Sequence, residues 1–259
     1  MIERLLAGIA LAGAIAIAAW RIRSLTPSGA VAAAIVGTVA TAAGWSWAAL
    51  VILFFVSSTA LSRLRADAKE RRVSAIVEKG GERDAAQVLA NGGVFAASAV
   101  AFTFGPEPVW QVAALGALAT ASADTWGTEI GTLAAGAPRS IVSGQRLDPG
   151  TSGGVTAVGT AAEVAGAAFL ALAAALLGWP GMALAGLAGG VAGAIGDSLL
   201  GATVQERRWC ERCEAATERR VHPCGTPTRI TGGIAGFRND GVNFASGLIG
   251  ALVAVLVSR

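Results

Sequence analysis

The chain has 259 residues, of which 54% are hydrophobic and only 14% are charged, and its mean hydropathy is +0.60. This balance excludes an ordinary soluble globular protein, in which about a quarter of the residues are charged. The formal net charge of +3 is too small to suggest a nucleic-acid partner. We therefore expect an integral membrane protein.

Eight apolar segments follow one another along the chain, and most approach the ~20 residues that cross ~30 Å of hydrocarbon as a helix. The second and third segments are short and could form one re-entrant pair, so seven spans are an alternative. We predict an all-α, polytopic helical bundle of about eight spans, folded as a single membrane-embedded domain over residues 1–259. The predicted spans are residues 5–20, 28–44, 46–62, 86–104, 109–133, 154–178, 181–204 and 241–257.

The connections between the predicted spans are of two kinds. Three are short and turn-like, at residues 44–47, 105–108 and 178–181, and the tryptophans among them are expected to form an interfacial belt. The others are longer and basic, and together they hold 18 of the 20 lysines and arginines. The positive-inside rule then places these loops in the cytoplasm of a multi-pass cell-membrane protein, with both termini outside. The most highly charged loop, 63–85, is predicted to extend the third span as a helix in water or on the headgroups.

Four carboxylates lie within or at the edge of apolar segments, where each costs at least ~2.5–3.5 kcal/mol to insert. Asp124, Glu129 and Asp197 lie toward the cytoplasmic ends of spans five and seven, whereas Glu163 lies well inside span six and has no assigned role. Converging acids at one membrane face favour a divalent cation site. The alternative is helix packing through small residues, with the acids paired to loop arginines. Asp124 and Glu129 point about 140° apart on an ideal helix, so both reach one site only if the helix breaks near Gly127.

The starts of several spans show glycines and hydroxyls that suit phosphate. Span six is expected to begin with the turn 150–154, where exposed amides and the positive end of the helix dipole would face an anion, with Arg146 just upstream. The similar segment 26–29 before span two is better explained by helix capping alone. Polar residues also open spans four and eight, where they would be costly if they had no role.

The loop at 205–238 contains all three cysteines and the only histidine of the chain. Cys210 and Cys213 form a CxxC pair that is followed by His222 and Cys224, which together supply four ligands for a closed tetrahedral zinc site. We predict a small cytoplasmic knuckle between the last two spans, with a structural zinc ion. Reduced, unligated cysteines in a compact loop are the alternative.

Two common enzyme classes are excluded by what the sequence lacks. No GxxxxGK[ST] segment occurs, which excludes a P-loop kinase. The single histidine lies in the cysteine cluster, so a Ser-His-Asp triad is not available either.

Several motifs resemble the integral membrane family that includes plant phytyl-phosphate kinase and transmembrane protein 19, often labelled cytidylyltransferase-like. This resemblance runs through nearly the whole chain. It implies an enzyme that transfers a phosphoryl group from a nucleoside triphosphate, with CTP the donor associated with the family, to an isoprenyl or phytyl monophosphate. The motifs are KGGERDAAQVLANGG (79–93), SADTWGTEIG (122–131), GTSGGVT (150–156), GAIGDSLLGATVQ (193–205), CGTPT (224–228) in the cysteine loop, and NDGVNF (239–244).

The resemblance also implies roles for individual residues. Asp124 and Asp197 are the leading Mg²⁺ ligands, and Glu129 and Asp240 are further candidates. The phosphates would be held by the turn that contains Thr151, Ser152, Gly153 and Gly154, and by Arg146, Lys79 and Arg83. Polar groups of the substrates would be oriented by Asn91, Gln205, Asn239 and Asn243, with Thr125 and Ser198 beside the two aspartates. The isoprenyl tail would lie between the Gly/Ala-rich helices and enter from lipid.

Three other activities stay open at this point. A cytidylyltransferase would form a CDP-activated lipid and release pyrophosphate, although the segment 231–240 lacks the second acid of that signature. A lipid-alcohol kinase would need a base to activate a hydroxyl. An ion-coupled transporter would use Asp124, Asp197 and Glu163 as a relay, but broken helices near the midplane would be expected for it.

Overall fold

In the computed structural model, which describes residues 2–78 and 80–259, the chain forms a bundle of eight long helices. They begin and end within a few residues of the predicted spans, which confirms the all-α membrane bundle. Among the described residues, six of the long helices are apolar and long enough to cross a membrane; α2, with 17 residues, is shorter. The long helices are α1 (Ile2–Arg21), α2 (Pro27–Ala43), α3 (Trp45–Arg63), α5 (Ala85–Phe104), α6 (Pro108–Gly131), α7 (Ala157–Leu176), α8 (Ala183–Thr203) and α9 (Asn239–Val257).

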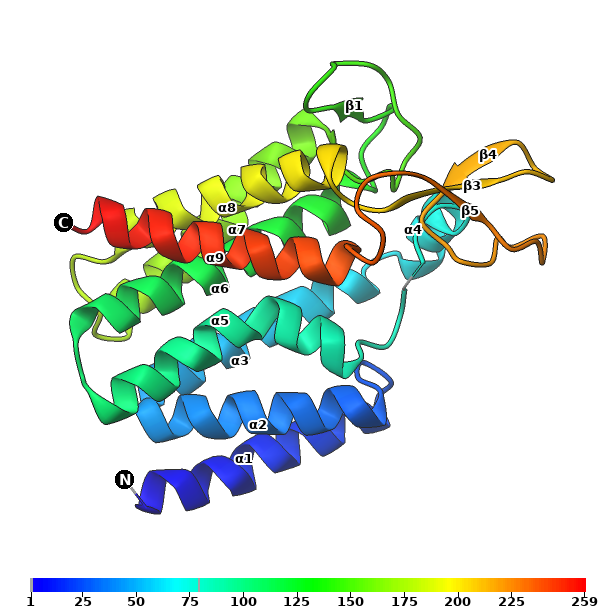
Figure 1. Cartoon of the computed structure of the whole chain (residues 1–259). Coiled ribbons are helices and arrows are strands. Elements are labelled where there is room, and N and C mark those ends of the chain that lie inside the picture. The colour runs from blue at the N-terminus through cyan, green and yellow to red at the C-terminus, as the bar shows by residue number, and fades with distance from the viewer. Residues whose placement is uncertain (1, 79) are drawn as a thin grey trace.

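The helices run side by side, and consecutive helices alternate in direction (Figure 1). Both termini and the three short links lie at one end of the bundle, and the short helix α4 (Ala66–Val73) and all the strands lie at the other. Below, the latter is called the polar end. This arrangement confirms that the long, charged connections share one side. The central helix is α6, which contacts α3, α5, α7, α8 and α9 and is almost completely buried from residue 114 to residue 123.

Close approach at glycines explains why this chain is so rich in small residues. A Cβ atom added to Gly193 of α8 would lie 2.1 Å from Oγ1 of Thr120, and one added to Gly250 of α9 would lie 2.0 Å from the same atom. Thr120 of α6 donates its hydroxyl hydrogen bond to the carbonyl of Gly116, 2.9 Å away. In lipid, helices associate by such close backbone packing rather than by burying apolar surface from water.

An aromatic cluster closes the bundle at the end with the short links. Trp47 packs against Phe95, Phe102 and Trp179, with ring centroids 4.9–5.5 Å apart. Trp47 and Trp179 are 2% and 3% exposed. The predicted interfacial belt is therefore wrong for these two side chains, because they fill the space between helices, although Trp45 is exposed.

The sequence predicts that the charged connection after α3 continues that helix, and this prediction is wrong. Helix α3 ends at Arg63, and Arg65 adopts a left-handed conformation with φ of 50°, which turns the chain before α4 begins at Ala66. The turn brings α4 back over the polar end of the bundle. As a result Lys69, on α4, is buried rather than solvated.

Two small antiparallel sheets cover the rest of the polar end. One pairs β1 (Arg139–Ser140) with β2 (Gly154–Val155) between α6 and α7. The other has the order β4-β3-β5 and lies between α8 and α9. Its strands are β3 (Arg207–Cys210), β4 (Ala215–Thr217) and β5 (Arg229–Gly232).

Candidate functional site

A polar cavity of about 550 Å³ opens at the polar end, between the ends of the helices and the loops that cover them. It is lined by residues of α3 to α9, so it gathers segments that are far apart in the sequence. Most of the residues that the sequence singles out line it. They are Arg83, Asn91, Asp124, Thr125, Glu129, Thr151, Ser152, Gly153, Gly154, Asp197, Ser198, Gln205, Asn239, Asp240 and Asn243.

Two of the predicted phosphate-binding residues are not in this group. Arg146 is exposed on the loop between β1 and β2 and is not among the residues that line the cavity. Lys79 lies outside the described residues. The structure adds cations that the sequence did not single out, since Lys69, Arg72 and Arg238 line the cavity as well.

Three partly buried carboxylates from three helices line the cavity. Asp124 comes from α6, Asp197 from α8 and Glu163 from α7, so the glutamate without an assigned role joins the two aspartates. Glu163 fits because it packs on a glycine: a Cβ atom added to Gly127 would lie 2.5 Å from its Cγ. Asp197 accepts a hydrogen bond of 3.2 Å from the Ser246 hydroxyl. No described lysine or arginine forms an ion pair with any of the three acids.

Glu129 lines the cavity, but its carboxylate already accepts hydrogen bonds from a lysine and a serine. Lys69 donates to its Oε2, and the Ser62 hydroxyl donates to its Oε1 at 2.7 Å. Lys69 also donates to the carbonyls of Leu61 and Ser62, at 2.7 and 2.9 Å. Helix α6 is unbroken to Gly131, so the break that would turn Glu129 toward Asp124 does not occur. Glu129 therefore anchors α4 to the bundle in this structure.

The acids of the cavity do not form a compact ligand cluster. Within the described part of the chain, the one group of three or more His, Cys, Asp or Glu close enough to share a metal ion is the cysteine–histidine cluster. Mg²⁺ usually keeps water and phosphate oxygens and takes only one or two protein carboxylates, so a site for it would not need such a cluster. The polar end also offers an orphaned acceptor, because Oδ1 of Asn243 is buried without a hydrogen-bond partner.

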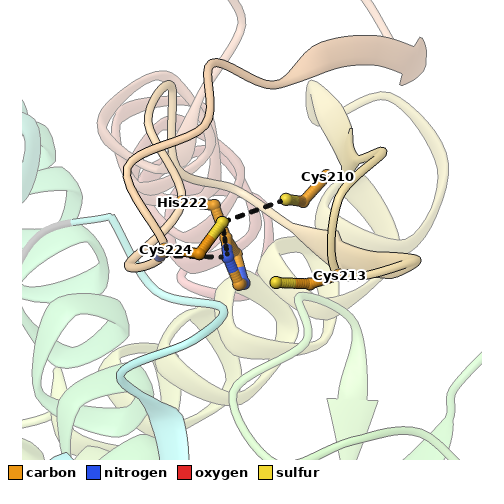
Figure 2. Close-up of side chains that lie close together, drawn as sticks. All are labelled: Cys210, Cys213, His222 and Cys224. Carbon is orange, nitrogen blue, oxygen red and sulfur yellow. Dashed lines mark hydrogen bonds between the residues drawn. The ribbon is translucent and has the colours of Figure 1, made fainter.

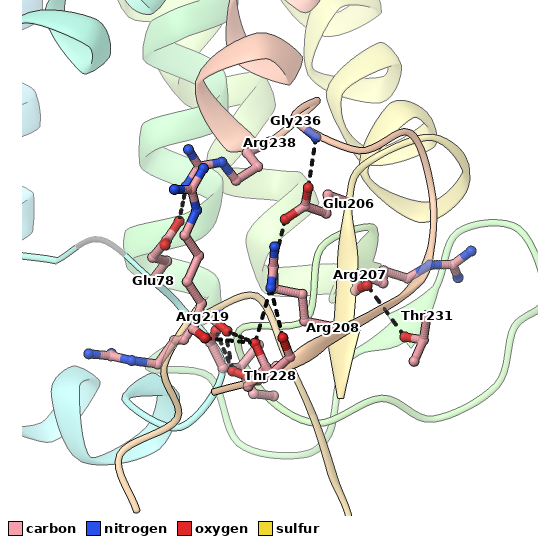
Figure 3. Close-up of polar contacts among 12 residues, drawn as sticks. Glu78, Glu206, Arg207, Arg208, Arg219, Thr228, Thr231, Gly236 and Arg238 are labelled. Atoms are coloured by element: carbon pink, nitrogen blue, oxygen red, sulfur yellow. Dashed lines mark hydrogen bonds and ion pairs between the residues drawn. The ribbon is translucent and has the colours of Figure 1, made fainter. Parts of the chain in front are cut away.

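Arginines enter the cavity from the loops. The Arg83 side chain donates to the Ser62 hydroxyl at 3.2 Å, while its backbone N–H donates to the Ser24 carbonyl and ties the start of α5 to the α1–α2 loop. Arg238, just before α9, pairs with Glu78 at 2.6 Å (Figure 3). These pairs fix two guanidinium groups at the rim of the cavity.

The glycine turn 150–154 lines the cavity but does not begin a helix. Strand β2 follows it, and α7 begins at Ala157 with Thr156 as its N-cap, so the expected helix dipole does not point from this turn. The turn packs on α8 instead: Gly153 has φ of 77°, and a Cβ atom there would lie 2.4 Å from the Cβ of Ala202. The segment before α2 is a simple cap, as expected, since Thr26 accepts from the N–H of Gly29.

The polar side chains of the cavity differ in how far they are already engaged. Asn91 donates to the Gln87 carbonyl at 3.0 Å, and the Thr125 hydroxyl donates to the Ala121 carbonyl at 2.8 Å. Gln205 is 2% exposed at the end of α8. The buried Oδ1 of Asn243 has no hydrogen-bond partner, which leaves it available for a ligand.

The cysteine–histidine cluster lies apart from the cavity, on the β4-β3-β5 sheet (Figure 2). One ligand atom from each of Cys210, Cys213, His222 and Cys224 lies within 4.8 Å of the others. Nδ1 of His222 is 3.2 Å from the Cys224 sulfur, which is 3.6 Å from the Cys210 sulfur. All three cysteines are free thiols. Four such ligands at this spacing fit a closed tetrahedral zinc site.

The same sheet is attached to both the cavity wall and the α4–α5 connection. Glu206 accepts from Nε of Arg208 at 2.6 Å and from the N–H of Gly236 at 2.7 Å (Figure 3). The hydrogen bond from Gly236 is the main reason why the pKa of Glu206 lies below its ordinary value, and the bond from Arg208 acts in the same direction. On the opposite side, Thr217 donates to the Ala75 carbonyl at 2.8 Å and Arg219 donates to the carbonyl of Val77 at 2.9 Å.

Comparison with known proteins places the chain among integral membrane proteins. The family model described as integral membrane protein DUF92 matches residues 10–251. Protein PGR of Arabidopsis thaliana is 30% identical over 98% of this chain and 96% of its own length. An uncharacterized membrane protein of Methanocaldococcus jannaschii is 33% identical over 63% of this chain and 67% of its own, and one of Synechocystis is 33% identical over 71% and 73%. No solved structure matches. The chain therefore belongs to the DUF92 family of integral membrane proteins.

Proposed function

We propose that the chain is a lipid-phosphate kinase, which transfers the γ-phosphoryl group of a nucleoside triphosphate to an isoprenyl or phytyl monophosphate. CTP is the donor that the resemblance to phytyl-phosphate kinase favours. The observation that carries the proposal is the polar cavity, which combines three partly buried carboxylates, several arginines and a glycine turn at one end of a membrane bundle.

This reaction requires the protein mainly to neutralise phosphate charge and to position the two substrates. An oxygen of the lipid phosphate attacks the γ-phosphorus, the bond to the β-phosphate oxygen breaks, and the nucleoside diphosphate leaves. A phosphomonoester has its second pKa near ~6, so the attacking oxygen is mostly ionised at pH 7 and needs no strong base. The cavity accordingly contains no histidine among its described residues. Catalysis by positioning and electrostatic stabilisation is typical of phosphoryl transfer.

Asp124 and Asp197 are the residues that would hold Mg²⁺, and Asp240 and Asn243 lie at the same cavity as further oxygen ligands. The orphaned Oδ1 of Asn243 and the carboxylates of Asp124 and Asp197, with which no described lysine or arginine forms an ion pair, fit a hard cation. When bound, Mg²⁺ would neutralise charge on the two facing phosphates. Glu163 would be the third carboxylate of the site, beside the two aspartates.

The arginines of the cavity would bind the phosphate oxygens that do not contact Mg²⁺. Arg83 and Arg238 are fixed at the rim by Ser62 and Glu78, so their guanidinium groups are oriented before a substrate arrives. Planar guanidinium groups suit phosphate because they donate two parallel hydrogen bonds. The turn 150–154 lines the same cavity and would shape the space for the phosphates, although the N–H groups of Thr151, Ser152 and Gly154 already donate to Asp148, Glu218 and Thr151.

The site would face the cytoplasm. Since 18 of the 20 basic residues belong to the long connections that the sequence places on one side, the positive-inside rule favours this orientation. A cytosolic nucleotide would then reach the cavity directly.

The decisive experiment follows the label of γ-labelled CTP incubated with purified protein and farnesyl, geranylgeranyl or phytyl phosphate. The proposal requires the label in the lipid product. Label in free pyrophosphate, with cytidine in the lipid, would identify a cytidylyltransferase instead. If no nucleotide in a panel of the four triphosphates labels any of the lipids, the kinase proposal is wrong.

A further inference from the structure

A second cavity, of about 100 Å³, lies between α1, α2, α3 and α5, on the side of the bundle away from α7 and α8 (Figure 1). Its wall is apolar over most of its length. The apolar side chains that form it include Ile15 on α1, Val36 on α2 and Val51, Ile52, Phe54 and Phe55 on α3. A cavity of this kind binds hydrocarbon rather than water, because water needs two to four polar partners.

The apolar cavity adjoins the polar one. Arg83, Gln87, Asn91 and Thr125 line both of them. The four residues come from the start of α5 and from α6, next to Asp124. A molecule that spans the junction would therefore have a charged group among arginines and carboxylates and an apolar body among the four helices.

The apolar cavity extends deep into the membrane-spanning part of the bundle. Thr41, which lines it, is fourteen residues beyond the start of α2 at Pro27. At 1.5 Å per residue this is about 21 Å below the polar end. That depth suits a chain of several isoprene units, whereas a short polar metabolite would leave it empty.

We propose that this cavity holds the hydrocarbon tail of the lipid monophosphate, whose phosphate lies at Arg83 and Asn91. The inference rests on the proposed kinase function and adds to it where the acceptor lies. It also gives the α1–α2 pair a role, because these two helices contribute no acid to the polar cavity but form one whole wall of the apolar one.

Gly92 and Gly93 of α5 offer a matched pair of variants. Gly92 lines the apolar cavity, and a Cβ atom there would meet only Val36, at 3.6 Å. A Cβ atom at Gly93 would meet the Phe244 ring at 3.5 Å, on the face toward α9. Gly92→Leu should raise the KM for geranylgeranyl phosphate by about tenfold or more and leave the KM for the nucleotide unchanged. Gly93→Leu should leave both KM values unchanged. The two variants should have similar melting temperatures, which shows that both are folded.

A binding experiment tests the cavity without relying on turnover. A geranylgeranyl phosphate with a diazirine at the far end of its tail is photolysed with the wild-type protein, without nucleotide, and labelled peptides are mapped by mass spectrometry. We expect labelling of α2 and α3 around Thr41 and Ala48, and competition by unlabelled geranylgeranyl phosphate. Competition by an acyl phosphate of equal length but not by the prenyl compound would mean that the cavity holds a fatty-acyl lipid.

The outcomes separate this inference from the proposed function. Phosphoryl transfer with competed labelling confined to α6–α9, or with no competed labelling, would overturn the tail cavity and leave the kinase standing. Competed labelling of α2 and α3 without transfer from any nucleotide would support the cavity and overturn the kinase. An unchanged KM in Gly92→Leu would also count against the cavity.

Discussion

Glu218 accepts two hydrogen bonds from Ser152, one from its hydroxyl at 2.5 Å and one from its backbone N–H at 3.3 Å. The glutamate directly follows strand β4, in the segment that leads to the cysteine–histidine cluster, and the serine belongs to the glycine turn of the cavity. Burial raises the pKa of Glu218 above its ordinary value, although the hydrogen bonds from Ser152 oppose this. The sheet between α8 and α9 thus supports the wall on which we place the phosphates.

Removing this support should weaken substrate binding more than chemistry. We expect Glu218→Ala to raise the KM for the nucleotide about tenfold, because hydrogen bonds to a charged group contribute about 1.5–3 kcal/mol, and to lower kcat much less. Steady-state kinetics measure this. Glu211→Ala is the control, since Glu211 lies on the same sheet in an exposed pair with Arg229. Equal effects of the two changes would show that Glu218 has no special role.

Asp124 and Asp197 give the sharpest test of the metal assignment. Asp124→Asn or Asp197→Asn should lower kcat by about 100-fold or more, because each removes charge that faces the reacting phosphates. Asp148→Asn, on the exposed loop before the glycine turn, should be active. Melting temperatures in detergent should be alike for all three variants. Full activity in both cavity variants would make the metal assignment wrong.

The buried pair of Lys69 and Glu129 is expected to stabilise the fold rather than bind metal. Lys69→Met should destabilise the protein by about 3–5 kcal/mol, because it leaves the carboxylate with Ser62 as its remaining partner. The double variant Lys69→Met/Glu129→Gln should recover much of this stability and retain activity. If Glu129 were a metal ligand, the double variant would stay inactive even after its stability returned.

Zinc in the cysteine–histidine cluster should be required for the structure of the polar end but not for the folding of the helical bundle. Metal analysis should find about one zinc per chain, and Cys213→Ser should reduce it, since all four ligands are needed for a closed site. We expect the Cys213→Ser protein to keep its helical circular dichroism and to show the raised KM of Glu218→Ala. A wild-type protein without zinc that has normal kinetics would contradict the zinc prediction.

The pKa of Glu206 gives a pH dependence with a definite sign. Because its pKa is lower in the folded state than its ordinary value of 4.5, the ionised carboxylate stabilises the fold above about pH 4.5. This contribution is lost as the pH falls through the lowered value. Glu206→Gln should therefore melt below the wild type at pH 6–7, and the gap should shrink below about pH 4.5. A gap that is constant with pH would contradict the assignment.

The sequence was sufficient to predict the bundle because the bilayer imposes simple rules. Segment length, apolar composition and loop charge predict the spans and their alternation without any knowledge of packing. The cysteine cluster was equally accessible, since its four ligands lie within fifteen residues of one loop. Both predictions use local sequence, and neither needs a distance between remote segments.

What the sequence could not give depends on packing between remote segments. Nothing near Lys69 in the chain indicates that α4 turns back to reach Glu129, because the left-handed turn at Arg65 occurs at a residue that rarely adopts it. Glu163 stayed without a role because it meets Gly127 from another helix. The glycine turn was assigned to a helix start, and only the pairing of β2 with β1 shows otherwise.

Among the described residues, the candidate site residues lie at the polar end, whereas both termini lie at the other end with the aromatic cluster around Trp47 and the short links (Figure 1). A reporter or purification tag fused to either terminus would therefore be separated from the polar cavity by most of the ~30 Å hydrocarbon layer. Such fusions would report membrane orientation directly, without touching the chemistry. They also make the protein suitable for immobilisation by one face, with the nucleotide supplied to the other.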